Sequence, residues 1–521
     1  MQPVRTVLAI LLAASASALA ADPPPAPPPV PQPITVDEVI DVRVVNVEAV
    51  VTDRGGRVLH GLTAADFQLL VDGREVPIGY FTEIRGAQAV VTPPASAADA
   101  GTDRPASPAA GSQLQPGTAV ARNYLVFIDD GFAVGARRDA ALARLRDGLR
   151  RLAPEDRMAI VAFGGAKLEM LSAWTGDKTA LGAALDRAAK RAPRGNQLLA
   201  QQRSMAGDEE IARYAGEADQ VAQELAELRV RVSPEVLTQL ARSSAAAAAA
   251  LRAFELPPGR RLLLLLSGGW SVATDPRLYA PLIEAANQLG YTLYPLDVAT
   301  GEVTALRLFD DLARTTGGRA LSSSGPAALA RVQEETDSYY LLGFSPTWKA
   351  DDRPHPLKVQ VRRPDLEVRS RSSYSDMSRQ STAALKAQSV LLFGADDPRA
   401  GAGAAQLKVE SGASRRLGRD EIEVPVTLQL PVSCLSFTGR GADLVAEVLL
   451  AVAALDDQGR RTELPEVVLH FRLASLPAAA RTLRFRTTVK LRRAEQHLVF
   501  ATVDMNTGAA LTAQLTVHPS G

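Results

Sequence analysis

The chain has 521 residues, 46% of them hydrophobic and 22% charged, and its 58 basic residues are balanced by 58 acidic ones. That length is too great for one hydrophobic core and predicts about three domains. The zero net charge argues against nucleic acid or an anionic membrane as the main partner, because both favour a basic surface. After the first 20 residues, no segment is long and apolar enough to span a bilayer.

The first 20 residues are predicted to be an export signal. Arg5 supplies the positive start, residues 7–14 form a short apolar core, and Ala18 and Ala20 are the small residues that signal peptidase accepts. We therefore expect cleavage after Ala20 and a secreted or periplasmic protein; the alternative is an uncleaved anchor. The single cysteine, Cys434, excludes an internal disulfide and a cysteine-based zinc cluster, and its apolar surroundings favour a buried, inert thiol.

The segments before the centre of the chain differ in composition. Residues 23–33 are nearly all proline and predict a stiff spacer. Residues 35–91 alternate apolar and polar side chains with a period of two, which predicts a small β unit. Residues 92–119 are rich in Ala, Pro, Ser and Gly and predict a disordered linker.

Strands and helices alternate through the central segment, residues 122–338. Its near-continuous apolar strands predict a parallel sheet with helices on both faces. Residues 197–254 interrupt this alternation with a helical pattern that Pro234 divides in two. This insertion is interpreted either as a two-helix cap on the sheet or as a partner-binding arm.

Alternation with a period of two returns after Ser338. Three antiparallel strands are expected within residues 338–374, beside the N-terminal strands, because either small set is marginal alone. About six strands in residues 420–521 predict a β-sandwich. The predicted boundaries are 1–20 (signal), 21–34 (Pro-rich spacer), 35–91 (N-terminal β unit), 92–121 (linker), 122–338 (α/β domain with the 197–254 insertion), 339–375 (strands beside the N-terminal unit), 376–419 (linker) and 420–521 (β-sandwich).

Several separated blocks resemble one protein family. They are "VVNVEAVVTDRGGRVLHGLTAADFQLLVDGREVPIGYF", "LPPGRRLLLLLSGG" and "ETDSYYLLGFSP", in that order. Together with the order of elements, they resemble the secreted bacterial VWFA-related (von Willebrand factor type A) proteins over roughly residues 35–375. The resemblance implies an α/β fold with a Rossmann-like von Willebrand factor A core flanked by β modules, and a non-catalytic binding role.

A metal-binding domain of this family carries a DxSxS motif, a threonine on a second loop and a distal aspartate, which together hold Mg²⁺ or Mn²⁺. Asp129 matches the first aspartate of that motif. The two hydroxyl positions fall on Gly131 and Ala133, and the distal aspartate falls on the Gly268–Gly269 pair. The sequence therefore predicts a degenerate metal-ion-dependent adhesion site.

Two alternatives to an empty site stay open. A rival ligand set consists of Asp129, Asp130, Thr175 and Asp177. Otherwise Asp129 accepts backbone N–H groups from the loop that follows it. A recognition rim is also predicted at this edge of the sheet, where a tryptophan either anchors a partner or plugs the site; its residues are Gly131, Ser267, Gly268, Gly269 and Trp270.

The leading hypothesis is a secreted, non-catalytic protein-binding or scaffold protein with no cofactor. The first alternative is an adhesion protein with a divergent Mg²⁺ or Mn²⁺ site, and the second is a cell-envelope hydrolase. The hydrolase is disfavoured because no nucleophile–base motif is readable and the histidines are scattered. They are His60, His355, His470, His497 and His518.

Overall fold

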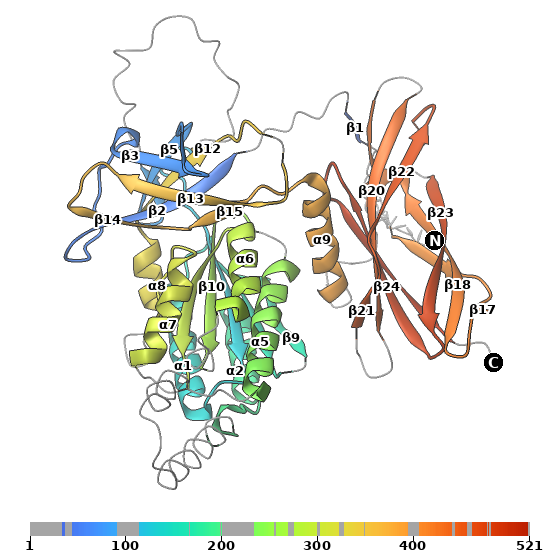
Figure 1. Ribbon diagram of the computed structural model, residues 1–521, viewed down its shortest axis with the longest axis horizontal. Helices are drawn as coiled ribbons and strands as arrows, with labels where there is room; N and C mark the ends of the chain where they lie inside the picture. The colour runs from blue at the N-terminus through green and yellow to red at the C-terminus, as the bar shows by residue number, and fades with distance from the viewer. Residues whose placement is uncertain are drawn as a thin grey trace, which may run out of the picture.

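The computed structural model is a mixed α/β protein with several sheets (Figure 1). The description covers residues 34–36, 44–90, 114–165, 167–197, 200, 234–254, 257–268, 276–299, 303–321, 328–348, 350–393, 406–439, 443–455, 461–476, 478 and 481–518. The predicted export signal and nearly all of the Pro-rich spacer lie outside these residues. Within them, no helix has the length and apolar character needed to cross a membrane.

The central sheet has five strands in the order β11-β10-β7-β8-β9. The strands are β7 (Arg122–Asp129), β8 (Arg157–Phe163), β9 (Leu168–Thr175), β10 (Arg260–Ser267) and β11 (Tyr291–Asp297). Neighbours among β11, β10, β7 and β8 pair in parallel, whereas β9 is antiparallel to β8. The expectation of a parallel sheet was therefore wrong for its outer strand β9. The connection between Phe163 and Leu168 is too short for a crossover, so the chain turns back.

Helices cover both faces of the central sheet. One face carries α1 (Gly135–Gly148), α2 (Lys178–Ala189) and α8 (Ala328–Thr336). The other carries α5 (Pro234–Ala253), α6 (Ala280–Leu289) and α7 (Val303–Arg314). Along β10, Leu262, Leu264 and Leu266 enter the first core, and Leu263 and Leu265 enter the second. Burial on both faces explains the unbroken leucine run.

Helix α5 corrects the predicted insertion. Its side chains Val236, Leu240 and Leu251 are buried in the core against the sheet, so residues 234–254 belong to the layer of helices and not to an inserted arm. The alanine run beginning at Ala245 suits this position, because small side chains allow α5 to pack closely. Residues 201–233 lie outside the described part.

The flanking β unit combines strands from before and after the central domain. One sheet has the order β14-β2-β12-β5-β6 and the other β15-β13-β3-β4. The earlier strands are β2 (Val45–Asp53), β3 (Phe67–Val71), β4 (Arg74–Val76), β5 (Tyr80–Arg85) and β6 (Gln88–Val90), and the later ones are β12 (Tyr339–Phe344), β13 (Pro354–Val361), β14 (Leu366–Ser370) and β15 (Ser373–Ser375). The central domain is thus inserted into one β unit. The end of the predicted linker also belongs here, since Ala89 and Thr118 are joined by a backbone hydrogen bond.

The C-terminal part is built from two sheets around one apolar core that includes Leu428, Phe437 and Phe500. One sheet contains β16 (Lys408–Ser411), β17 (Arg415–Arg416), β18 (Glu421–Pro431) and β23 (Thr482–Arg492). The other contains β1 (Ile34–Val36), β19 (Ser436–Thr438), β20 (Leu444–Leu455), β21 (Arg461–Glu463), β22 (Val467–Leu473), β24 (Gln496–Asp504) and β25 (Ala510–Val517).

Two predicted boundaries change with this arrangement. Residues 376–419 are not a plain linker, because they contain α9 (Arg379–Phe393), β16 and β17. Helix α9 buries Ala383, Ala387 and Leu391, spaced by four residues, against β20 and β24, and Figure 1 shows it between the central domain and the C-terminal sheets. Strand β1 pairs in parallel with β19, so residues 34–36 belong to the C-terminal sheet and not to the spacer or the N-terminal unit.

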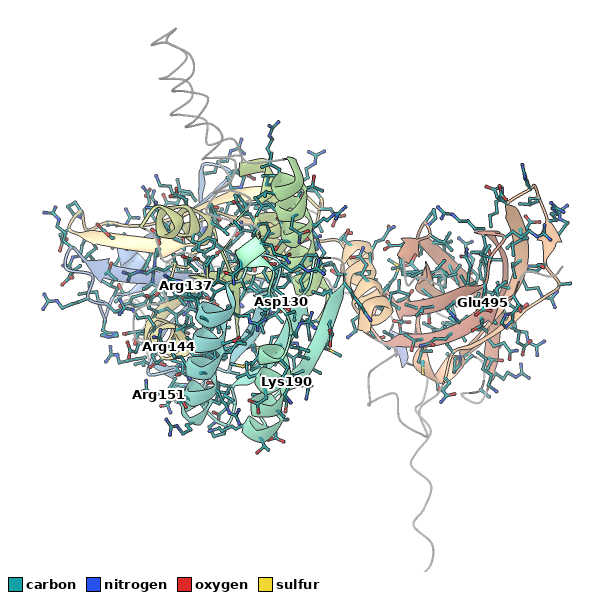
Figure 2. The ribbon with its side chains drawn as sticks, turned by 90° about the horizontal axis from the view of Figure 1, so that it is seen from below. Asp130, Arg137, Arg144, Arg151, Lys190 and Glu495 are labelled. Atoms are coloured by element: carbon teal, nitrogen blue, oxygen red, sulfur yellow. The ribbon has the colours of Figure 1, made fainter. Side chains whose placement is uncertain are left out.

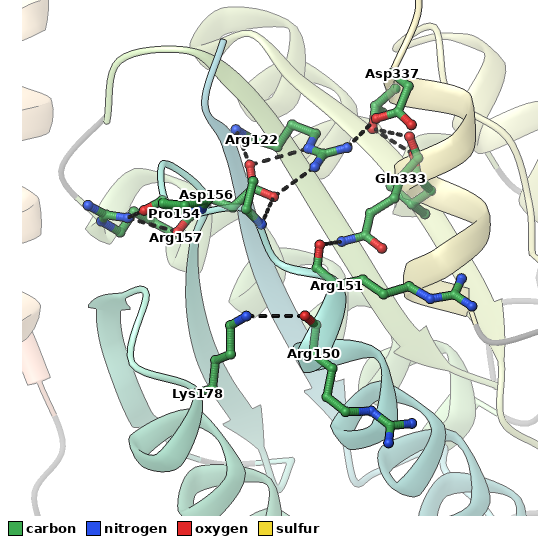
Figure 3. Close-up of polar contacts among 12 residues, drawn as sticks. Arg122, Arg150, Arg151, Pro154, Asp156, Arg157, Lys178, Gln333 and Asp337 are labelled. Atoms are coloured by element: carbon green, nitrogen blue, oxygen red, sulfur yellow. Dashed lines mark hydrogen bonds and ion pairs between the residues drawn. The ribbon is translucent and has the colours of Figure 1, made fainter. Parts of the chain in front are cut away.

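The parallel strands of the central sheet start at the end that faces the β unit, which we call the amino edge, and end at the opposite, carboxyl edge. The strand arrow of β10 accordingly points away from the β unit in Figure 1. Charged contacts hold this edge together (Figure 3). Arg122 at the start of β7 forms ion pairs with Asp156 at 2.9 Å and with Asp337 at 2.5 Å. The amide of Gln333 on α8 donates to the carbonyl of Arg151. The opposite, carboxyl edge holds the side chains singled out by the sequence.

The candidate site at the carboxyl edge of the central sheet

Asp129 ends β7 and is fully buried. Its Oδ2 accepts hydrogen bonds from the Ser243 hydroxyl at 2.5 Å and the Ser267 hydroxyl at 2.8 Å. Its Oδ1 accepts the backbone N–H of Gly131 at 3.1 Å. The interpretation in which Asp129 accepts a backbone N–H group from the following loop is therefore confirmed. Both carboxylate oxygens are already satisfied by groups of the chain itself.

Asp130 is also buried and is neutralised by two guanidinium groups. Its Oδ1 lies 2.7 Å from Nη1 of Arg138, and its Oδ2 lies 2.6 Å from Nε of Arg191. Arg138 is buried as well and donates to the backbone carbonyls of Ala189 and Arg191. This cluster ties the loop after β7 to α1 and to the end of α2. Both oxygens of this carboxylate are thus engaged in charge-assisted hydrogen bonds with guanidinium groups.

The other positions that match ligands of a metal-binding VWFA site are filled by neighbouring groups of the chain. A Cβ placed at Gly131 would lie 2.9 Å from Nε2 of Gln239 on α5. A Cβ placed at Gly268 would lie 2.0 Å from the Cβ of Ala299 and 2.9 Å from the carbonyl oxygen of Phe132. Ala133 is fully buried in the core. No distal aspartate fits at Gly268 unless the backbone shifts.

The rival ligand set is contradicted by the direction of β9. Thr175 pairs with Met158 at the start of β8, whereas Asp129 pairs with Phe163 at its end. The two positions are separated by about 17 Å, at roughly 3.3 Å for each of five residues. Asp177 is the N-cap of α2, where its side chain accepts the N–H groups of Thr179 and Ala180.

The predicted recognition rim is wrong for the residues that can be placed. Gly131, Ser267 and Gly268 are all buried and offer no surface to a partner. Their burial follows from the contacts of Gln239 and Ala299 with this edge. Gly269 and Trp270 lie outside the described residues.

Sequence reasoning missed the residues that close this edge: Arg138, Arg191, Gln239 and Ser243. The one available signal was the Ser243–Ser244 pair, which interrupts an otherwise apolar stripe of α5. A hydroxyl on a buried helical face needs an acceptor. The sequence alone does not say that Asp129 is that acceptor.

Exposed basic side chains run along α1, from the carboxyl edge of the central sheet toward its amino edge. Arg137, Arg144 and Arg151 are seven residues apart on and just after α1, and all are exposed. Figure 2 shows them along the helix, with Asp130 beside its first turn. A spacing of seven residues places side chains on nearly the same face of a helix. The outer face of α1 therefore carries a row of three arginines, with the exposed Asp147 between the last two.

Other chemistry is sparse in the part of the chain that the structure describes. There, no group of three or more His, Cys, Asp or Glu side chains is placed to hold a metal ion. Cys434 is a free thiol in a short 3₁₀ turn and is partly exposed, so it is less buried than predicted. His355 contacts the carboxylates of Asp72 at 2.8 Å and Asp351 at 3.1 Å.

Comparisons with known proteins add little to this geometry. The sequence matches no protein-family model. No curated protein matches it either. Structural neighbours include the SpRpn10 VWA domain, with a TM-score of 0.23, 11% identity, and coverage of 42% of this chain and 97% of that one. They also include the TFIIH p34 N-terminal domain, with a TM-score of 0.20, 14% identity, and coverage of 41% and 96%. Scores of this size carry no argument about function.

Proposed function

We propose that this protein is an exported, non-catalytic binding protein whose central domain is of the VWFA type and works without a metal ion at Asp129. One observation supports the absence of a metal: Asp129 is fully buried, and its Oδ2 already accepts hydrogen bonds from the Ser243 and Ser267 hydroxyls. A functional site of this type needs oxygens that are free to bind Mg²⁺ and a partner carboxylate together. In this protein the oxygens of Asp129 instead accept hydrogen bonds from hydroxyl and N–H groups of the chain itself.

The central experiment is an ion titration of thermal stability. A site with a dissociation constant near 10 μM, held at 1 mM Mg²⁺ or Mn²⁺, would add roughly 2.7 kcal/mol. For a domain of about 200 residues, that would raise the melting midpoint by several degrees. We expect the same midpoint in Mg²⁺, Mn²⁺ and EDTA. An ion-dependent rise that disappears in Asp129→Asn would favour the metal-dependent adhesion protein instead.

The partner is proposed to dock on the outer face of α1, because the predicted rim is buried while Arg137 and Arg151 are exposed. Such a face suits an acidic protein surface. The protein should retain a partner from native envelope fractions equally well with and without EDTA. The double variant Arg137→Glu/Arg151→Glu should lose that partner. Unchanged retention by the double variant would contradict docking on α1.

The remaining alternative is a hydrolase of the cell envelope. The secreted protein is expected to show no turnover of generic esterase and peptidase substrates. Turnover that one carboxylate or serine substitution abolishes would overturn the non-catalytic assignment.

N-terminal sequencing of the exported protein should give Ala21 as the first residue.

A further inference from the structure

A small cavity lies where the β unit meets the amino edge of the central sheet, far from Asp129. We call it the junction pocket. It has a volume of about 40 Å³ and is lined by residues that include Glu48, Arg260, Thr292, Thr316, Arg369 and Arg371. One water needs roughly 10–15 Å³ on this measure, so there is room for about three waters or for one small polyatomic ion.

Positive charge exceeds negative charge around the junction pocket. Three guanidinium groups line it against a single carboxylate, that of Glu48. Arg260 pairs with Glu48, with Nε and Oε2 2.8 Å apart. Arg369 lies 3.3 Å from Glu335, which is also 3.5 Å from Arg319. Glu48 is therefore already paired with Arg260, and Glu335 is shared between two arginines.

Arg371 has no carboxylate within ion-pair distance among the described residues. Its Nη1 donates to the carbonyl of Asn287 at 3.3 Å, and its Nη2 donates to the carbonyl of Asn46 at 2.6 Å. Burial lowers the pKa of Arg371 to about 10, although Glu48 acts in the opposite direction. In the part of the chain that the structure describes, the hydrogen bonds of this guanidinium group therefore go to backbone carbonyls.

Some buried donors of the pocket-lining residues are also unsatisfied. Nη1 of Arg260 and Nε of Arg371 are buried and have no hydrogen-bond partner in the described part of the chain. Arg260 as a whole is 2% exposed, and its guanidinium carbon lies 4.3 Å from the centre of the Tyr339 ring. Buried donors nearly always find an acceptor, so a ligand with acceptor oxygens fits this environment.

We infer that the junction pocket binds a small oxyanion, either a carboxylate or a phosphate group, between the guanidinium groups of Arg260, Arg369 and Arg371. Guanidinium groups bind such oxyanions by paired N–H···O bonds, which is why arginine is favoured for this task. The bound group would bridge β2, the start of β10 and the segment after β14, and so would fix the β unit on the central domain. This inference does not depend on the proposed function.

The test is a thermal melt of the full chain in sodium phosphate, sodium acetate or sodium chloride at equal ionic strength. Phosphate or acetate should raise the melting midpoint above its value in chloride in a concentration-dependent way. The oxyanion that gives the rise identifies whether the pocket prefers phosphate or carboxylate. Equal midpoints in all three salts would overturn the inference.

Two substitutions locate the effect. Arg369→Gln, at a partly exposed position, should weaken the apparent oxyanion affinity about tenfold or more through loss of a charge-assisted hydrogen bond. Glu48→Gln should strengthen the response, because it removes the carboxylate that competes for Arg260. A general loss of stability would not weaken the oxyanion response in one variant and strengthen it in the other. Arg137→Gln, on the distant face of α1, should respond like the wild type. Responses of Arg369→Gln and Glu48→Gln that match the wild type would place the ion elsewhere.

Discussion

The two edges of the central sheet hold charged side chains in opposite states. At the carboxyl edge, Asp130 lies between Arg138 and Arg191, and Asp129 is saturated by hydroxyl and N–H donors. At the amino edge, the partly exposed Arg371 donates hydrogen bonds to backbone carbonyls beside a cavity and has no ion pair in the described part of the chain. The sequence pointed to the first edge, because acidic residues follow a strand there. The comparison teaches that conspicuous charges can be structural, while a guanidinium group with buried, unsatisfied donors and no ion pair points to a ligand.

The largest expected effect is at Asp130. Asp130→Asn leaves the buried guanidinium of Arg138 without its carboxylate, and removing one partner of a buried pair costs about 3–5 kcal/mol. Urea unfolding should show a loss of about 3 kcal/mol, because Arg138 keeps its bond to Asp139. The control is Asp186→Asn, in the exposed pair with Arg146, which should cost less than about 1 kcal/mol. Equal losses in the two variants would mean that the buried ion pairs of Asp130 stabilise the fold no more than an exposed ion pair does.

Placing an aspartate at Gly268, the distal position of a metal-binding VWFA site, should damage the protein and create no metal site. Gly268→Asp forces a side chain against Ala299 and the carbonyl of Phe132, and overpacking of this kind costs about 1–3 kcal/mol. Gly418→Asp is the matched control, since a Cβ at Gly418 meets nothing within 4 Å. We expect a clear loss only in Gly268→Asp, with no Mg²⁺-dependent recovery of the melting midpoint. Recovery in Mg²⁺ would mean that the edge retains a metal site.

A loss of similar size is expected when Asp129 becomes an amide. Asp129→Asn replaces one accepting oxygen by a donor that faces either both the Ser243 and Ser267 hydroxyls or the N–H of Gly131, at a cost of about 1–3 kcal/mol. Urea unfolding measures this loss, and Asp311→Asn, at an exposed position on α7, serves as the reference. A variant as stable as the wild type would show that these hydroxyls do not need the carboxylate.

The smallest effect is a dependence on pH at His355 in the β unit. Burial lowers the pKa of His355, but its hydrogen bonds to Asp72 and Asp351 outweigh this and hold the pKa above its ordinary value. The stabilisation is therefore complete below about pH 6.5, the unfolded value, and is lost as pH rises through the folded pKa. It should stay below about 1 kcal/mol, because the two carboxylates are solvent-exposed. Unfolding at pH 5.5 and pH 8.5 should show the difference in the wild type and not in His355→Gln.

The metal-site prediction shows where sequence reasoning ends. The absence of hydroxyl side chains at Gly131 and Ala133 was readable directly. The failure of Thr175 and Asp177 as substitutes was not, because a short connection reverses β9 and carries Thr175 to the opposite edge of the sheet. Periodicity identifies a strand but not its direction, since parallel and antiparallel strands have the same alternation of side chains.

The sequence by itself determined the local structure: the alternation of helices and strands in the centre, the alternating β strands on either side, and the position of Asp129 at the end of its strand. These follow from side-chain periodicity over a few residues. Only the tertiary structure brought Ser243 to Asp129, and Glu48, Arg260 and Arg371 to one pocket. Such contacts join segments that are 100 residues or more apart, so topology and packing, and not local pattern, decide which of them meet.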